Sequence, residues 1–115
     1  MALYNIYHGL NGGFSGAKYD YTRYFDGAGY AELEAYNCAI EDYQSYEGSH
    51  GILSEEDIKR EYMEDNEIEN EEDLTDRDYD TIAERYREEV ESWIEFYAIR
   101  ADEDDSVPEE ERDVI

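Results

Sequence analysis

Residues 2–25, ALYNIYHGLNGGFSGAKYDYTRYF, decide the fold, because two short runs rich in Tyr flank a cluster of glycines. Aromatic runs on either side of turn residues are typical of a β-hairpin. In the second run Tyr19, Tyr21 and Phe25 fall on alternate positions, so one strand face is largely aromatic. We therefore predict strands over residues 2–9 and 18–25. A lone hairpin is marginal in water and must pack on another element.

The packing partner is predicted to be a helix over residues 28–47. Large residues recur there at helical spacing beside a set of small ones, and Gly48 follows as a stop signal. The large residues are Tyr30, Leu33, Asn37 and Ile40, and the small ones are Ala31, Ala35, Cys38 and Ala39.

Two start signals predict further helices. In the first, Ser54 can cap a helix over residues 55–65, with Asp57 completing a capping box. The second follows twenty-one residues later, where Thr75 can cap a helix that keeps its apolar period to about Arg100. The remaining residues, 102–115, are acidic and without an apolar period, which is typical of disorder. Deleting residues 104–115 is therefore expected to leave the fold intact.

These elements predict an α+β fold, with an N-terminal β-hairpin packed on two or three α-helices. A long acidic helix ends the fold, and an acidic disordered tail follows it. At 115 residues the chain suits one domain, which we expect over residues 1–101, with the tail at 102–115.

The charge balance excludes several classes of function. Thirty-four Asp and Glu oppose nine Lys and Arg, a formal net charge of −25, which disfavours direct binding to nucleic acid or to an anionic membrane. One Cys and two His cannot build an ordinary structural zinc site, and no cofactor is expected. With thirty-four acids, some pair of carboxylates must lie close together by chance. Such a pair therefore does not indicate a catalytic site, and we expect that the protein is not an enzyme. A soluble cytoplasmic protein is expected, since no apolar run or export signal is present.

The distribution of the acids is the strongest functional signal. Residues 51–115 hold twenty-seven of the thirty-four. On the predicted last helix five acids recur every three or four residues, which places them in one row over about 22 Å. Each pair of like charges at this spacing destabilises a helix by about 0.2 to 0.5 kcal/mol. That the sequence keeps these acids indicates a function for the negative electrostatic field that they create. Together with the acids that precede this helix, the predicted contact residues are Glu64, Asp65, Glu67, Glu69, Glu71, Glu72, Asp73, Asp80, Glu84, Glu88, Glu91 and Glu95.

Rows of carboxylates on a helix can imitate DNA phosphates, which DNA-binding proteins contact largely through Lys and Arg. We therefore predict a DNA mimic that binds a basic DNA-binding protein. The alternative is an acidic adaptor that binds another protein through a Tyr-rich surface, with Tyr46 and Tyr62 as surface candidates. A halophile's acidic surface remains a third explanation. A homodimer is also predicted, because Tyr79, Trp93 and Tyr97 belong to a long apolar stripe.

In size, acidity, aromatic content and helical acidic surface, the chain resembles the small phage-encoded DNA mimics, the anti-restriction and anti-CRISPR inhibitors. Residues 38–52, CAIEDYQSYEGSHGI, are similar to a segment of small tailed-phage proteins. The resemblance implies a phage protein acting in the host cytoplasm. Its expected partner is a basic DNA-binding protein of the host or, for an adaptor, a host or phage protein. Its expected activity is to block the DNA-binding groove of a CRISPR effector or restriction enzyme.

Overall fold

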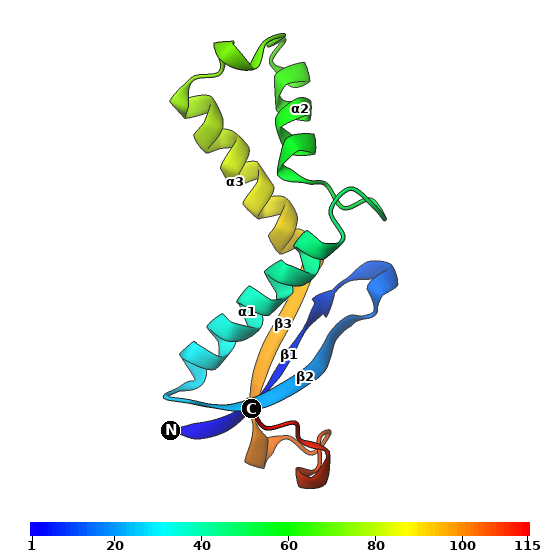
Figure 1. Cartoon of the computed structure of the whole chain (residues 1–115), viewed down its shortest axis with the longest axis vertical. Coiled ribbons are helices and arrows are strands. Elements are labelled where there is room, and N and C mark those ends of the chain that lie inside the picture. Colours follow the sequence, from blue (N-terminus) through cyan, green and yellow to red (C-terminus); the bar gives the residue numbers. More distant parts are fainter. The chain divides into compact units, whose positions relative to one another are not determined.

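A computed structural model describes residues 1–115 and confirms the α+β class. Its three-stranded antiparallel sheet has the order β2-β1-β3, and three α-helices accompany it. The elements, labelled in Figure 1, are β1 (Ala2–Leu10), β2 (Gly16–Phe25), α1 (Ala28–Ser45), α2 (Glu55–Asp65), α3 (Asp76–Trp93) and β3 (Ile94–Arg100). None of the helices combines the length and apolar character that crossing a membrane requires.

The chain forms two compact units. The sheet unit comprises Met1–Asp42 and Trp93–Ile115, and the helical unit comprises Tyr43–Ser92. The predicted single domain over residues 1–101 stays a prediction.

The predicted hairpin is confirmed in the sheet unit. β1 and β2 pair antiparallel with an irregularity after Ile6, and the short 3-10 helix Gly12–Phe14 lies in the connection. Gly9 is needed in β1, because a Cβ there would lie 2.2 Å from the carbonyl oxygen of Gly16. The two strands therefore approach more closely at this position than a side chain would allow.

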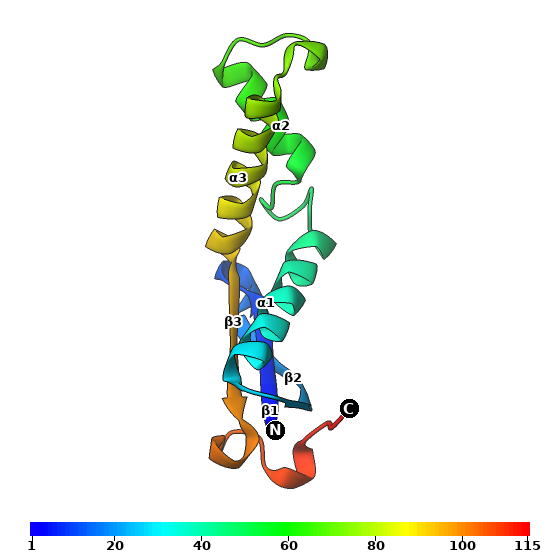
Figure 2. The ribbon, with the colours of Figure 1, turned by 90° about the vertical axis from the view of Figure 1, so that its left-hand side faces the viewer.

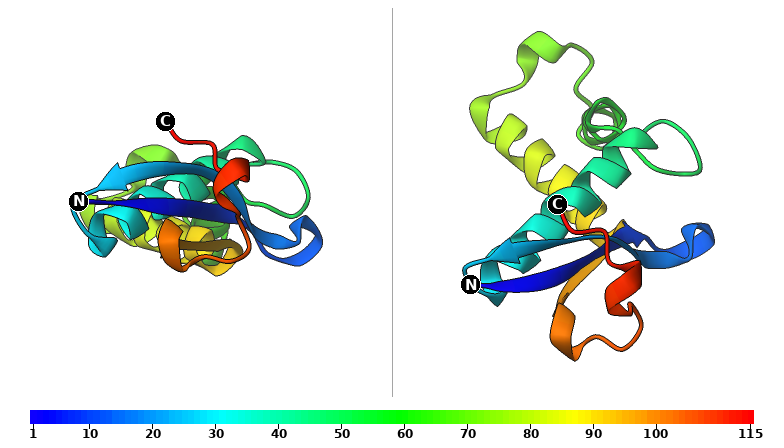
Figure 3. Two further views of the ribbon diagram at one scale, coloured as in Figure 1. Left: turned by 90° about the horizontal axis from the view of Figure 1, so that it is seen from below. Right: turned by 60° about the horizontal axis from the view of Figure 1, so that its bottom comes forward.

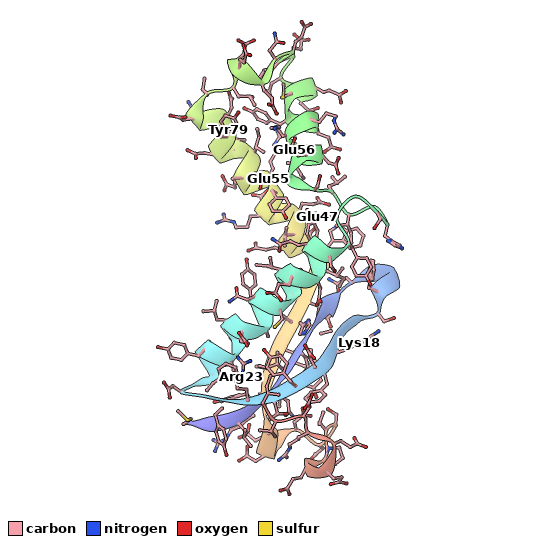
Figure 4. All side chains as sticks on the ribbon, viewed as in Figure 1. Lys18, Arg23, Glu47, Glu55, Glu56 and Tyr79 are labelled. Atoms are coloured by element: carbon pink, nitrogen blue, oxygen red, sulfur yellow. The ribbon has the colours of Figure 1, made fainter.

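Helix α1 packs on one face of this sheet through its small residues. Ala31 and Ala35 are fully buried and form a cluster with Ile6 and Tyr21 of the two hairpin strands. Small side chains let the helix backbone approach the sheet, so the face that carries Tyr30 and Leu33 is left outside, 66% and 55% exposed. At the start of this helix, Figure 4 shows Arg23 of β2, which pairs with Glu34 of α1 at 2.5 Å.

The prediction that the last helix continues to Arg100 is wrong. Helix α3 ends at Trp93, and Ile94–Arg100 forms the third strand, antiparallel to β1 with Tyr7 opposite Tyr97. Ile94, Phe96 and Ile99 favour a strand. In the strand conformation this segment also forms a ladder of backbone hydrogen bonds with β1, a tertiary interaction that the helical periodicity of the sequence does not take into account. The hairpin therefore gains a third strand as well as the predicted helix. In Figure 2 this strand lies beside β1.

The prediction of a disordered tail is not confirmed. Residues 101–115 turn through two short 3-10 helices, Ala101–Glu103 and Glu109–Glu111, and belong to the sheet unit. The right panel of Figure 3 shows this segment crossing the strands, with α1 behind them. Val114 forms a parallel bridge with Thr22 of β2, which fixes the end of the segment at the edge of the sheet.

The helical unit confirms both predicted helix starts. Ser54 caps α2 with a capping box to Asp57, and Thr75 and Asp78 exchange the corresponding bonds at the start of α3. Its core consists of Ile58, Tyr62 and Ile82, and the surrounding half-buried residues are Leu53, Ile68, Leu74 and Tyr86. The apolar residues of α2 and α3 face this core, and the acids lie on the other sides of the two helices.

Candidate functional site

The acidic surface of the helical unit is the candidate site. Residues 43–92 carry nineteen Asp and Glu against five Lys and Arg, a formal net charge of −14. The sheet unit, although longer, carries fifteen acids against four bases, a net charge of −11. All twelve acids predicted from the sequence are exposed, and eleven of them belong to the helical unit.

Helix α3 carries what we call the acidic row, Asp80, Glu84, Glu88 and Glu91. All four are exposed, whereas Ile82 and Val90 of the same helix are buried. At about 100° per residue the four acids fall within an arc of about 80° opposite Ile82, and they extend over about 16 Å of the axis. The row is therefore shorter than the predicted one.

Glu95 does not belong to this row, because it lies on β3 in the sheet unit. Its side chain accepts a hydrogen bond from the backbone N–H of Ala17 at 3.0 Å. Glu95 lies opposite Gly9 in the β1 register, and Gly9 in turn lies opposite Ala17, so the carboxylate reaches over a residue without a side chain. Glu95 thus holds the start of β2 and leaves the predicted site.

The second part of the site is the acidic connection between α2 and α3. Its members are Glu64, Asp65, Glu67, Glu69, Glu71, Glu72 and Asp73, and each of them is exposed. The first two end α2, and the last three form the 3-10 helix Glu71–Asp73. Glu67 has a φ of 56°, a left-handed conformation that turns the chain out of α2. Side chains of this region are drawn in Figure 4.

Few bases neutralise these acids. Lys59 pairs with Glu71, Arg85 lies 3.5 Å from Asp65, and Arg87 lies 3.9 Å from Glu84. Exposed pairs of this kind contribute about 0 to 1 kcal/mol, so they reduce the local field without stabilising the unit strongly. The acids of the site that form no ion pair include Glu64, Glu67, Glu69, Glu72, Asp73, Asp80 and Glu88.

The position of Glu64 and Asp65 is unfavourable for folding. They occupy the last turn of α2, which holds no basic residue. The partial negative charge of a helix C-terminus repels carboxylates by about 0.3 to 1 kcal/mol each. The sequence thus retains acids where they oppose helix stability, which favours a role for them outside folding.

Other motifs do not form sites. Asp78, whose spacing with Asp76 and Asp80 resembles the start of a calcium loop, caps α3 and accepts a bond from Tyr62 at 2.5 Å. Hydrogen bonds from the Thr75 backbone and from Tyr62 lower the pKa of Asp78. No group of three or more His, Cys, Asp or Glu side chains is placed to hold a metal ion.

Sequence reasoning missed a buried polar network in the sheet unit. Asp104 is 8% exposed and accepts hydrogen bonds from Asn5 at 3.0 Å and Tyr7 at 2.5 Å. Burial raises the pKa of Asp104, but bonds from Asn5, Ser106 and Tyr7 outweigh it and lower the pKa to about 2. The carboxylate is therefore charged and fully committed to the fold. Its partners Asn5 and Tyr7 lie almost a hundred residues away in the sequence, so local patterns do not reveal these two bonds.

His8 of β1 lies between two carboxylates of the sheet unit. Its Nε2 lies 2.7 Å from Asp20 of β2, and its Nδ1 lies 2.5 Å from Asp42 of α1. Burial lowers the pKa of His8, but the hydrogen bonds to Asp42 and Asp20 together raise it above its ordinary value. Both ring nitrogens can donate only in the charged imidazolium, so His8 joins helix and strand as a cation.

Comparison with known proteins identifies no relative, since no family model, curated protein or solved structure matches the chain.

Proposed function

We propose that this protein is a stoichiometric inhibitor that mimics the charge of DNA and occupies the DNA-binding groove of a host defence protein. The target class is a CRISPR effector or a restriction enzyme, and the action requires no catalysis. The acidic row and the acidic connection of the helical unit form the contact surface. Glu95 is left out of that surface because of its bond to Ala17.

The observation that carries the proposal is the concentration of exposed acids where they oppose folding. Within the acidic row, neighbouring carboxylates lie about one helical turn apart and repel each other by about 0.2 to 0.5 kcal/mol per pair. At the end of α2, Glu64 and Asp65 oppose the helix dipole. A surface selected only for solubility would not need acids at these positions.

Charge density explains why both parts of the surface are needed. Successive acids of the row lie about 5.5 Å apart along the helix axis. Duplex DNA presents one charge per about 1.7 Å of its axis, so the row alone reaches about a third of that density. The seven acids of the connection supply further charge, and the two together approach the field that a basic groove binds.

The adaptor alternative has one observation in its favour. Tyr30 and Leu33 are exposed on α1. Tyr46, which follows α1, and Tyr79 of α3 are 40% and 47% exposed. Tyr62 is no candidate for such a surface, because it is 8% exposed and packs in the core of the helical unit. An adaptor that binds through these aromatic side chains would keep its affinity as salt rises, whereas a mimic would lose it.

The experiment compares two triple variants of equal net charge against purified CRISPR effectors and restriction enzymes. The first, D80N/E84Q/E88Q, removes three acids of the row. The second, E109Q/E110Q/E111Q, removes three exposed acids of the sheet unit and serves as the matched control. Binding of the inhibited target is measured by surface plasmon resonance at several salt concentrations.

The row variant should bind between about threefold and about a hundredfold more weakly, because exposed charge pairs contribute about 0.2 to 1 kcal/mol each. The control should bind like the natural protein. Equal loss in both variants would mean that only net charge matters, and unchanged binding in both would exclude the proposed surface.

A further inference from the structure

A cavity at one end of the sheet unit is lined partly by arginine. Because β1 is antiparallel to both of its neighbours, its start lies beside the end of β2 and the end of β3. The C-terminal segment reaches the same end of the sheet, and together these segments border a cavity of about 240 Å³. The residues that determine its chemistry are Leu3, Tyr24, Arg100, Asp102 and Arg112.

Arg112 is the unusual residue of this lining. The chain holds thirty-four acids, yet Arg112 forms no ion pair with any of them. Its Nη2 donates to the Ala101 carbonyl at 2.8 Å, and its Nε is buried without a hydrogen-bond partner. The other two bases without an ion pair, Lys18 and Arg77, are exposed, whereas Arg112 is half-buried. Burial removes part of the hydration of a charged group, so the fold leaves this guanidinium in need of an anionic partner.

The local charge of the cavity is positive. Asp102 is the one acid in the lining, and its carboxylate lies 3.1 Å from the Nε of Arg100. The charge of Asp102 is therefore matched by Arg100, and the charge of Arg112 remains. This makes the cavity a place of positive charge in a chain whose formal net charge is −25.

We propose that the cavity binds a small organic anion, whose carboxylate or phosphate group pairs with Arg112. A guanidinium forms short, charge-assisted hydrogen bonds with either group. Leu3 and Tyr24 lie opposite each other in the register of β1 and β2, and they offer an apolar contact to the body of the ligand. Cavities for drug-sized ligands have about 300 to 1,000 Å³, so this one suits a charged group with a body no larger than a single ring.

The site is independent of the proposed DNA mimicry. All residues that line the cavity belong to the sheet unit, whereas the acidic row and the acidic connection belong to the helical unit. The net charge of the chain repels an anion at long range, and salt screens that repulsion. The short-range bonds to Arg112 must outweigh the part that remains.

Nuclear magnetic resonance of the isotope-labelled full chain tests the proposal. Phenyl phosphate and benzoate carry the same ring and differ in the charged group, and each is titrated in at constant ionic strength. The backbone signals of Leu3, Tyr24, Ala101 and Arg112 should shift to saturation with at least one of them. The probe that binds more tightly identifies the charged group of the ligand.

Two matched pairs of variants complete the test. R112Q should weaken binding by about tenfold or more, because a charge-assisted bond is lost, while R77Q removes the same charge from an exposed residue of α3 and should bind like the natural protein. Circular dichroism must show that R112Q is folded.

The second pair decides the question if R112Q does not fold. Tyr24 and Tyr30 are 56% and 66% exposed, so an acid is tolerated at either position. Y24E places a negative charge at the cavity and should weaken binding by about threefold or more, whereas Y30E adds the same charge on α1 and should not. Shifts that never saturate with either probe, or equal binding by the two members of each folded pair, would overturn the proposal.

Discussion

Replacing Asp104 should destabilise the sheet unit strongly, although the residue lies in a segment whose sequence is typical of disorder. The carboxylate closes a chain of hydrogen bonds across the sheet. The Asn5 side-chain amide donates to Asp104, and the Thr22 hydroxyl donates to the Asn5 side-chain oxygen Oδ1 at 2.6 Å. The Tyr19 hydroxyl bonds Thr22 and accepts a hydrogen bond from the Asp113 N–H at 2.8 Å. This series of hydrogen bonds therefore begins at Asp104 and ends at Asp113, both in the C-terminal segment.

The magnitude follows from the donors that would lose the Asp104 carboxylate in D104A. Asn5 is fully buried and Tyr7 is 6% exposed, and both donate to Asp104, although the Tyr7 hydroxyl keeps the Ser106 hydroxyl as a partner at 2.8 Å. A buried donor that loses its acceptor costs about 1 to 3 kcal/mol, and a hydrogen bond to a charged group contributes about 1.5 to 3 kcal/mol, so the free energy of unfolding should fall by about 2 to 5 kcal/mol. D104N keeps the volume and one acceptor, and we expect a loss of about 1 to 2 kcal/mol from it.

The pH dependence gives an independent measure of the same interaction. The pKa of Asp104 falls from 3.8 to about 2 on folding, which corresponds to about 2 kcal/mol of stability. Because the folded-state pKa is the lower one, this stability is present above about pH 4 and is lost as the pH falls toward 2. D104N should lack this part of the acid dependence.

Urea unfolding followed by near-ultraviolet circular dichroism measures both effects, since the Tyr side chains of the network report directly on the sheet unit. Deleting residues 104–115 should lower stability as D104A does, which is the opposite of what the sequence alone predicts. If D104A and the deletion each change the free energy of unfolding by less than about 0.5 kcal/mol, the range of ordinary surface substitutions, the segment is not packed as described.

Two further predictions concern the same unit. The pKa of His8 is raised in the folded state by Asp42 and Asp20, so its contribution to stability is complete below the unfolded pKa and is lost as the pH rises through the folded one. Urea unfolding measured as the pH is raised from below the ordinary His pKa of 6.5 should show this loss, and an unchanged slope in H8Q would contradict it. G9A should cost several kcal/mol or prevent folding, because the new Cβ would lie 2.2 Å from the Gly16 carbonyl oxygen. If G9A were as stable to heat as the natural protein, the two strands would be able to move apart at this position, and the prediction would be wrong.

The helix starts of the helical unit could be predicted because their signals are local. Ser54 and Asp57 are three residues apart, and so are Thr75 and Asp78, and each pair satisfies the free N–H groups of its own first turn. The structure needs no distant residue to form these caps. The exposure of the acids follows for a similar reason, because charged side chains at helical spacing opposite an apolar face have little alternative to solvent.

The change from helix to strand at Ile94 could not be predicted from periodicity. The apolar period of α3 continues through Ile94 and Tyr97, but the same residues also suit a strand. The choice depends on β1, which lies some ninety residues earlier and offers a complete ladder from Leu10 to Tyr4. Because of this change, Glu95 does not belong to the predicted row of acids. Tyr97 lies on β3 and no longer shares a helix face with Tyr79, so the apolar stripe from which the homodimer was predicted is not continuous.

The order of the C-terminal segment depends on single contacts that composition conceals. Its acids indicate disorder when averaged, yet Asp104 is buried with partners on β1, and Val107 is 6% exposed. Arg112 donates to the Ala101 carbonyl at 2.8 Å and closes the segment on itself. Averaged charge therefore described the surface of this segment correctly and its packing incorrectly.

Competition with DNA tests the central claim most directly. A target that the protein inhibits is loaded with a labelled DNA duplex, and the protein is titrated in while fluorescence anisotropy follows the DNA. The account predicts that the natural protein and E109Q/E110Q/E111Q displace the duplex completely, while D80N/E84Q/E88Q needs a higher concentration to do so. A stable ternary complex of target, protein and DNA held in its groove would contradict DNA mimicry.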